Sequence, residues 1–379
     1  MKRSLLIFFM IASLLLCGCQ VAPTDPLESI PETEPLESGS RPLEEASSEE
    51  PVKTMPDPFL TSSLKGFGAA SVITLKNLPV NKAVQQIDFY ENEGNLYVFV
   101  TQRSKSTVYL SRHLVNPQTG RTTLMDSVEL HGYGHGESME ISFHQGVLYL
   151  FVTSGANPLN SYYWGTQITR LKYEGGAITE EKHLTGMESI TFNGAPMFED
   201  AAPYRVNFGL DDEADLLVAY VRASKGDSEE GILQRLSCYT LSAIHSALDA
   251  ATQSVSIAEL CHKRVATMEN TTTEQICSNG SFQGIEVAPD GTIYLTGGSD
   301  DNMPQLSVFR QNGGVISRES VTSIDFLSSR VLGAWDFKTS THYYEIESIK
   351  YYQGALYCVF NPAGDLRQSF TEIYLLLNQ

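Results

Sequence analysis

Four acidic residues recur at matching places along the chain: Asp88, Glu140, Glu286 and Glu347. If the repeats converge on one axis, with Asn207 as a fifth member, the carboxylates would repel one another. They would have to be protonated, hydrogen-bonded or neutralised by a cation such as Ca²⁺. Glu140, Glu286 and Asp88 would also suit a glycosidase, in which one carboxyl acts as general acid and another as base or nucleophile. The alternative is structural, with these side chains capping backbone amides between repeats.

A histidine between two glycines precedes the second of these acids. His135 lies in "HGYGHGESME", residues 131–140, where glycines allow a tight turn and a close approach to a ligand. Because a histidine donates, accepts and binds metals, we predict a ligand-binding role for His135. The alternative is that it only shapes a turn. His131 is expected to be an exposed turn residue.

An aromatic stretch follows in "NSYYWGTQ", residues 160–167. Exposed aromatic rings stack on sugars, so Trp164 and Tyr163 are candidate ligand-binding residues, and Gln167 would bond a hydroxyl. Alternatively, Trp164 packs two structural units together. No serine-nucleophile motif accompanies these residues.

The acids belong to a repeat that predicts the fold. In each copy an apolar residue and the acid precede a polar turn and an aromatic strand, as in "QQIDFYENEGNLYVFVTQ" from Gln85. The matching tyrosines lie nine, nine, eight and ten residues beyond the acid; they are Tyr97, Tyr149, Tyr294 and Tyr357. With a weaker copy from Tyr204, five units share residues 59–379, a length that suits four-stranded blades. We therefore predict an all-β, five-bladed β-propeller, closed by pairing of Ala70–Leu75 with Phe370–Leu377.

The first residues have the pattern of an export signal. Lys2 and Arg3 precede an apolar run, residues 5–16, that is too short to span a bilayer. The run ends in Leu-Cys-Gly-Cys, which resembles a bacterial lipobox. We expect residues 1–18 to be a signal peptide and Cys19 to be the lipid anchor; an ordinary secretory signal is the alternative. Residues 19–58, rich in proline and acids, are expected to be a disordered tether.

Charge and cysteine content narrow the function further. Residues 59–379 carry 22 Lys plus Arg against 35 Asp plus Glu, which argues against nucleic-acid binding. Cysteines Cys238, Cys261 and Cys277 match no zinc pattern, and a disulfide within this trio is expected in an exported protein. A helix is expected at Leu241–Ala251. Cys358 is expected to be a buried free thiol.

Two motifs resemble the helveticin J-like, class III bacteriocin-like family. They are "GHGESMEIS" from Gly134 and "WGTQITRLKY" from Trp164, and "VQQIDFY" from Val84 fits the same pattern. That family is similar to five-bladed propellers of phage receptor-binding and teichoic-acid-associated proteins. The resemblance implies a propeller that acts at bacterial cell surfaces, whereas a lipid anchor would keep this chain on its producer.

We therefore expect a monomeric, non-enzymatic lipoprotein anchored outside the cytoplasm of a Gram-positive bacterium. Its propeller would bind a cell-envelope polysaccharide or teichoic acid. The alternative functions are an extracellular glycoside hydrolase or lyase that uses the channel carboxylates, and a bacteriocin-like lytic protein or its immunity partner.

Overall fold

A computed structural model describes residues 67–157, 162–225, 232–271, 273–276, 281–299, 302–324, 345–361 and 371–378. All described residues belong to one compact unit of the chain. The expected signal peptide, Cys19 and tether lie outside the described residues. Within the described part, no helix is both long and apolar enough to cross a membrane.

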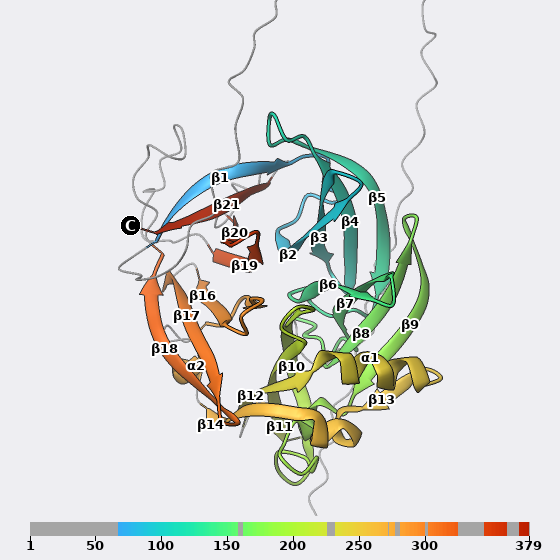
Figure 1. Cartoon of the computed structure of the whole chain (residues 1–379), viewed down its shortest axis with the longest axis vertical. Helices are drawn as coiled ribbons and strands as arrows, with labels where there is room; N and C mark the ends of the chain where they lie inside the picture. The colour runs from blue at the N-terminus through green and yellow to red at the C-terminus, as the bar shows by residue number, and fades with distance from the viewer. Residues whose placement is uncertain are drawn as a thin grey trace, which may run out of the picture. The chain divides into compact units, whose positions relative to one another are not determined.

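Twenty of the described strands form five antiparallel blades of four strands, arranged around a central axis (Figure 1). From the innermost strand outwards, the first blade is β2 (Val84–Asn92), β3 (Asn95–Ser104), β4 (Thr107–Val115) and β5 (Thr122–His131), and the second is β6 (Met139–His144), β7 (Val147–Ser154), β8 (Gln167–Glu174) and β9 (Ala177–Thr185). The third is β10 (Ala201–Asp211), β11 (Leu216–Lys225), β12 (Leu233–Thr240) and β14 (Arg264–Thr271), and the fourth is β15 (Ile285–Val287), β16 (Ile293–Ser299), β17 (Asn302–Asn312) and β18 (Val315–Ser323). The fifth is β19 (Glu345–Tyr352), β20 (Ala355–Asn361), β21 (Thr371–Asn378) and β1 (Phe67–Leu75). A single parallel bridge, Thr267 to Val315, joins the outer strands of the third and fourth blades.

The ring closes as predicted. Strand β1 pairs with β21, the C-terminal strand, and Ala70 lies opposite Leu375. Each innermost strand contacts the next, from β2 through β6, β10, β15 and β19 back to β2. The described strands therefore form an all-β propeller with five blades, and the repeated acid–turn–tyrosine unit marks the inner hairpins of four of them.

The inner hairpins explain why the repeat is visible in the sequence. Glu93 and Gly94 both have positive φ, 52° and 77°, and Gln145 and Gly146 repeat this with 52° and 77°. Two consecutive positive φ values define the type I′ turn, whose twist matches that of the strands it joins. Apolar residues of the inner hairpins then fill the space between neighbouring blades, as Phe99 does against Leu150 and Leu171.

An insertion in the third blade covers part of the second. Helix α1 (Leu241–Ala250) follows β12 as predicted, and β13 (Ser254–Ser256) adds to β9 in parallel. A 3₁₀ segment, η2 (Ile257–Lys263), begins with a capping box between Ser256 and Glu259. The remaining short elements are η1 (Met187–Ser189) and α2 (Thr273–Ile276).

The described cysteines correct one expectation and confirm another. Cys238 and Cys261 both carry free thiols, so no disulfide joins them; Cys238 is buried in the strand core, where its sulfur packs as an apolar group. Cys277 lies outside the described residues. Cys358 is a buried free thiol, as predicted.

Candidate functional site

Three of the predicted carboxylates meet near the axis, and a lysine lies among them. The Lys350 ammonium nitrogen lies 3.3 Å from Asp88 Oδ2 and 2.9 Å from Glu286 Oε2, and it also contacts Glu140 Oε2. All four side chains are at most 8% exposed. The carboxylates therefore converge as expected, and their neutralising cation is an ammonium group of the chain itself. We call these four residues the Lys350 cluster.

The Lys350 cluster also joins neighbouring blades. Asp88 accepts hydrogen bonds from the backbone amides of Phe89, at 2.7 Å, and of Ile141 in the second blade, at 2.6 Å. Glu286 accepts from the amide of Tyr351 in the fifth blade, at 3.1 Å. These contacts are those of the structural alternative, in which the acids cap backbone amides between repeats.

Glu347 and Asn207 do not join the cluster. A β-bulge between Ile346 and Ser348 leaves Glu347 without a place in the ladder, which accounts for the longer spacing to Tyr357. Glu347 instead accepts a hydrogen bond from Gln85, at 3.4 Å. Among the described residues, no group of three or more His, Cys, Asp or Glu side chains has the arrangement of a metal site, and Ca²⁺ binding stays a prediction.

Burial controls the protonation of the cluster. It raises the pKa of Asp88, raises that of Glu140 well above its ordinary value and raises that of Glu286 to about 8, although Lys350 opposes each shift. For Lys350, burial acts to lower the pKa, but the three carboxylates together raise it. The lysine thus stays charged, whereas Glu286 takes up a proton near neutrality.

The stability of the protein should therefore fall as the pH rises from 5 to 8. Between the ordinary pKa of 4.5 and about 8, folded Glu286 holds a proton that the unfolded chain has lost. For each such group, the free energy of unfolding falls by up to about 1.4 kcal/mol for every unit by which the pH rises. Urea unfolding at several pH values measures the slope, and Glu286→Gln should flatten it. A stability that rises over this range would contradict the assignment.

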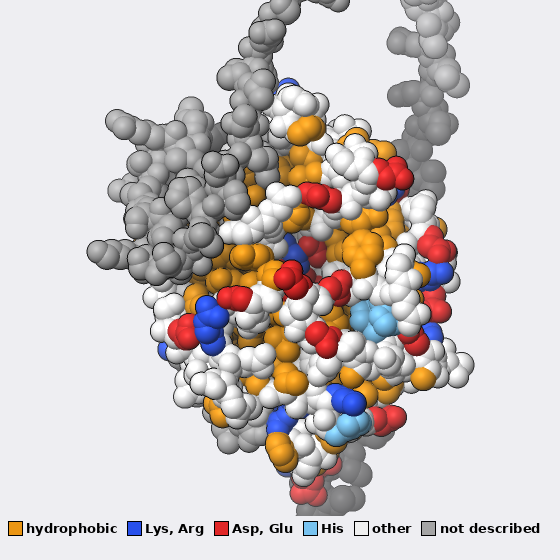
Figure 2. Space-filling view, in the orientation of Figure 1, with side chains coloured by type: hydrophobic (Ala, Val, Ile, Leu, Met, Phe, Trp, Pro, Cys, Tyr) orange, Lys and Arg blue, Asp and Glu red, His pale blue; other side chains and the backbone are white. Residues whose placement is uncertain are grey.

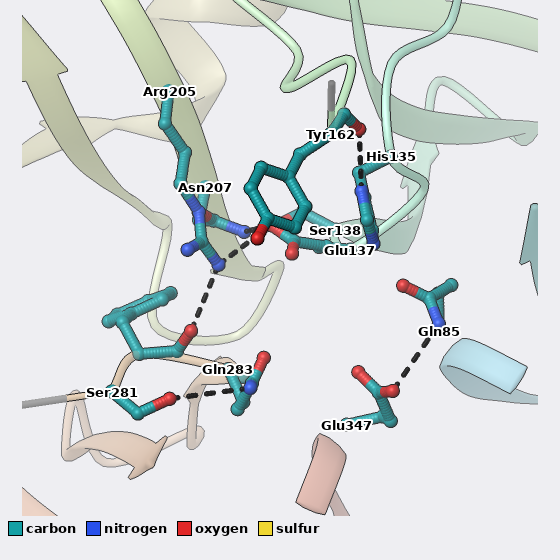
Figure 3. A network of polar contacts seen from close by, with 12 residues as sticks. Gln85, His135, Glu137, Ser138, Tyr162, Arg205, Asn207, Ser281, Gln283 and Glu347 are labelled. Carbon is teal, nitrogen blue, oxygen red and sulfur yellow. Dashed lines mark hydrogen bonds and ion pairs between the residues drawn. The ribbon is translucent and has the colours of Figure 1, made fainter. Parts of the chain in front are cut away.

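A second polar network surrounds the axis where the innermost strands begin (Figure 3). We call this place the start end. Each of its carboxylates has a donor from a neighbouring blade: Glu137 pairs with Arg205 at 2.7 Å, Glu345 accepts from Gln283 at 2.6 Å, and Glu347 accepts from Gln85. All five blades thus contribute a polar side chain to this end.

Arg205 connects three blades at the start end. Besides Glu137, its guanidinium donates to the carbonyl oxygen of Phe282, at 2.9 Å, and to Asn207 Oδ1, at 2.8 Å. Its Cζ lies 3.9 Å from the centroid of the Trp164 ring, a cation–π contact. Arg205 therefore holds Trp164 beside the polar network.

The predicted His135 and Trp164 lie in contact. Their rings stack with centroids 4.5 Å apart, and Tyr162, which is 55% exposed, stacks on Trp164 at 5.4 Å. Gly134 makes this possible, because a Cβ there would lie 2.7 Å from the backbone nitrogen of Gly165. The two motifs can approach so closely only while position 134 is glycine, whereas a Cβ at Gly165 would lie 2.8 Å from Thr153 Cβ.

His135 is held as a neutral ring. Burial and the nearby Arg103 lower its pKa to about 3, and its Nδ1 lies 2.7 Å from the carbonyl oxygen of Tyr162. Its side chain therefore takes part in the aromatic stack rather than in proton transfer near pH 7. His131 is exposed, as predicted, with 75% of its side chain accessible.

The other two predicted ligand residues differ in position. Tyr163 is half-buried with φ of 57°, and the Cζ of Arg103 lies 6.0 Å from its ring. Gln167 lies on β8, the third strand of its blade, where its amide packs over Gly155. Tyr163 thus adjoins the start end, whereas the described contacts of Gln167 are within its own blade.

A serine and a histidine do meet, but without the geometry of a nucleophile. Ser142 Oγ lies 2.8 Å from His245 Nε2, while His245 Nδ1 faces Arg170 Nη1 at 3.0 Å. Because an arginine can only donate, Nδ1 must accept and Nε2 carries the proton, so His245 cannot deprotonate Ser142. Both side chains are buried. This pair attaches α1 to the second blade.

The ends of the innermost strands have a different character. Their hairpins carry acids and no lysine or arginine; the acids include Glu91, Glu93, Asp212, Glu213 and Asp290. Figure 2 shows acidic side chains around the centre of the face that it presents. Aromatic rings, arginines and paired carboxylates are combined at the start end, which is therefore the candidate ligand site.

Sequence reasoning missed several residues of these two groups: Gln85, Arg103, Glu137, Arg205, Gln283 and Lys350. Glu137 had a usable signal, because it stands in the same motif as His135 and Glu140. Gln85 and Gln283 also precede their repeat acids by three residues. Arg103 and Arg205 had no such signal, since their partners are distant in the chain.

Two proteins of known structure with a similar backbone are named as enzymes that act on carbohydrates. An exo-β-1,3-galactanase from Phanerochaete chrysosporium is 12% identical, with a TM-score of 0.47 over 81% of this chain and 64% of that one. An α-L-arabinofuranosidase from Podospora anserina in complex with cellotriose is 10% identical, with a TM-score of 0.43 over 83% of this chain and 98% of that one.

No curated protein sequence matches the chain. A family model does, and it covers most of the propeller, from the strand that closes the ring to the innermost strand of the fifth blade. The model is described as bacteriocin helveticin-J and matches residues 71–349, so the chain belongs to the helveticin J family.

Proposed function

We propose that the propeller binds a carbohydrate polymer of the bacterial cell envelope at the start end and does not cleave it. The observation that carries this proposal is the stack of Tyr162 on Trp164 beside polar side chains from all five blades. Aromatic faces pack against the C–H surface of a sugar ring, and fixed polar groups then orient its hydroxyls. Membership of a bacteriocin family supports an action at cell surfaces.

Binding is favoured over cleavage because the predicted catalytic acids are already engaged. Asp88, Glu140 and Glu286 are buried and contact Lys350, and two of them also accept backbone hydrogen bonds. A glycosidase needs a protonated and an ionised carboxyl that both reach the sugar. If turnover occurs, Glu137 becomes the first acid to mutate, since burial raises its pKa at the start end itself.

We also propose that a lipid on Cys19 anchors the protein outside the cytoplasm, with residues 19–58 as its tether. The support is the charged start, the apolar run and the Leu-Cys-Gly-Cys motif. Cys19→Ala should move the protein from the detergent-rich to the aqueous phase in Triton X-114 partitioning. An unchanged partition would refute the anchor and leave the binding site untouched.

The binding proposal is tested by mixing the protein with purified Gram-positive cell walls and following both pelleted protein and released sugar. We expect co-sedimentation without release. Released fragments would support the glycoside hydrolase or lyase instead, and absence from the pellet would contradict a wall ligand. A chelator arm tests the predicted Ca²⁺, because loss of binding would reveal a required metal ion.

A further inference from the structure

We infer that the polymer is anionic and that Arg103 binds its negatively charged groups. This inference rests on the proposed function and specifies its ligand class. The shared chemistry is an oxyanion with two acceptor oxygens, either a phosphate diester or a carboxylate, attached to a sugar or polyol. Arg103 would hold the oxyanion while Tyr162 and Trp164 hold the neighbouring ring or chain.

Arg103 is held at the start end by one edge of its guanidinium. It lies on β3, the second strand of the first blade, and its Nη1 donates to the carbonyl oxygen of Tyr162, at 2.5 Å. The same nitrogen contacts His135 Nδ1. Both neighbours are uncharged, because His135 stays neutral. The backbone oxygen and the imidazole thus fix the direction of the guanidinium without neutralising it.

The other edge of the guanidinium is not engaged. Within the described part of the chain, Arg103 Nε and Nη2 have no hydrogen-bond partner, and Arg103 makes no ion pair. An arginine offers five N–H donors in a planar fork, which matches two oxygens of a phosphate or carboxylate. A half-buried arginine fixed by one edge is therefore ready to bind an oxyanion with the other.

The carboxylates of the start end do not take this place. Glu137 is paired with Arg205 and Asn207, Glu345 with Gln283, and Glu347 with Gln85. Burial lowers the pKa of Arg103, and the more distant charges of Glu137 and Glu347 only partly oppose this. Its positive charge is thus incompletely balanced by the protein, and a ligand oxyanion would complete the balance.

The position of Arg103 relative to the aromatic stack favours a polymer over an isolated ion. Its guanidinium donates to the backbone of Tyr162, the residue whose exposed ring stacks on Trp164. One repeat of a charged polymer would therefore place its anion on Arg103 and its ring or chain on Tyr162. Repeating units add further contacts, whereas inorganic phosphate would gain only the first.

The test compares three probes by isothermal titration calorimetry with the full chain: poly(glycerol phosphate), polygalacturonate and a neutral galactan. We expect at least one anionic polymer to bind about 10-fold or more tightly than the galactan, as charge-assisted hydrogen bonds allow. The better of the two anionic polymers identifies phosphate or carboxylate as the preferred group.

Arg103→Gln should reduce anionic binding about 10-fold or more and galactan binding by clearly less, and Arg103→Lys should retain part of the preference. The matched control, Arg318→Gln, removes the same charge from an exposed position on β18 and should change neither. Equal binding of all three polymers, or an equal loss for all in Arg103→Gln, would overturn the inference and leave the proposed function standing. No binding to these probes or to cell walls would overturn both.

Discussion

Lys350→Met should lower the free energy of unfolding by about 3–5 kcal/mol at pH 8, the largest stability effect that we expect from a single substitution here. The reason is that three buried carboxylates, Asp88, Glu140 and Glu286, lose their common cation. Methionine keeps much of the volume of the lysine stem, so the loss reports charge rather than packing. Urea unfolding followed by circular dichroism measures it.

The pH dependence of this loss separates electrostatics from packing. At pH 5 Glu286 is protonated, because its pKa is about 8, and the raised pKa of Glu140 favours its protonated form too, so the variant should be closer to wild type than at pH 8. Lys172→Met, which removes an ammonium from a partly exposed pair with Glu174, should change stability little at either pH. A loss for Lys350→Met that is the same at both pH values would refute the charge explanation.

Much of the fold could be predicted because propeller blades are local repeats. Each inner hairpin forms between neighbouring segments, so its alternation, its type I′ turn and its tyrosine appear together in one short stretch, as around Glu93 and Gly94. The pairing of β1 with β21 was also predictable, since a closed ring leaves only one partner for a strand that precedes the first blade.

The site was less predictable because its contacts cross between blades. In the sequence, Glu347 aligns with the acids of the other repeats. A bulge at Glu347 displaces the repeat by one residue, so Lys350 and not Glu347 lies at the centre of the cluster. The contact of Arg205 with Trp164 depends on the packing of the third blade against the second. No local pattern encodes either event. His135 and Trp164 were identifiable as unusual residues, but not as partners.

Trp164→Ala should weaken binding to the cell-wall polymer by about 30-fold or more, the size expected when an aromatic residue at the centre of a site is removed. Truncation removes the surface on which Tyr162 stacks and the ring that Arg205 covers. Both sides of the ligand site would thus lose their support. Trp164→Phe keeps a smaller aromatic face and should lose less affinity. Calorimetry with the solubilised polymer measures both variants.

A matched control distinguishes this site from a general effect of exposed aromatic residues. Phe192 is 78% exposed and lies after η1, where the Cζ of Arg264 is 4.6 Å from its ring centroid. Phe192→Ala should bind the polymer as the wild type does. Because Trp164 also helps to join blades, unfolding curves must show that Trp164→Ala is folded at the assay temperature. A folded Trp164→Ala protein with wild-type affinity would exclude the start end as the binding site, because no ligand could use Tyr162 and the polar network while ignoring the ring between them.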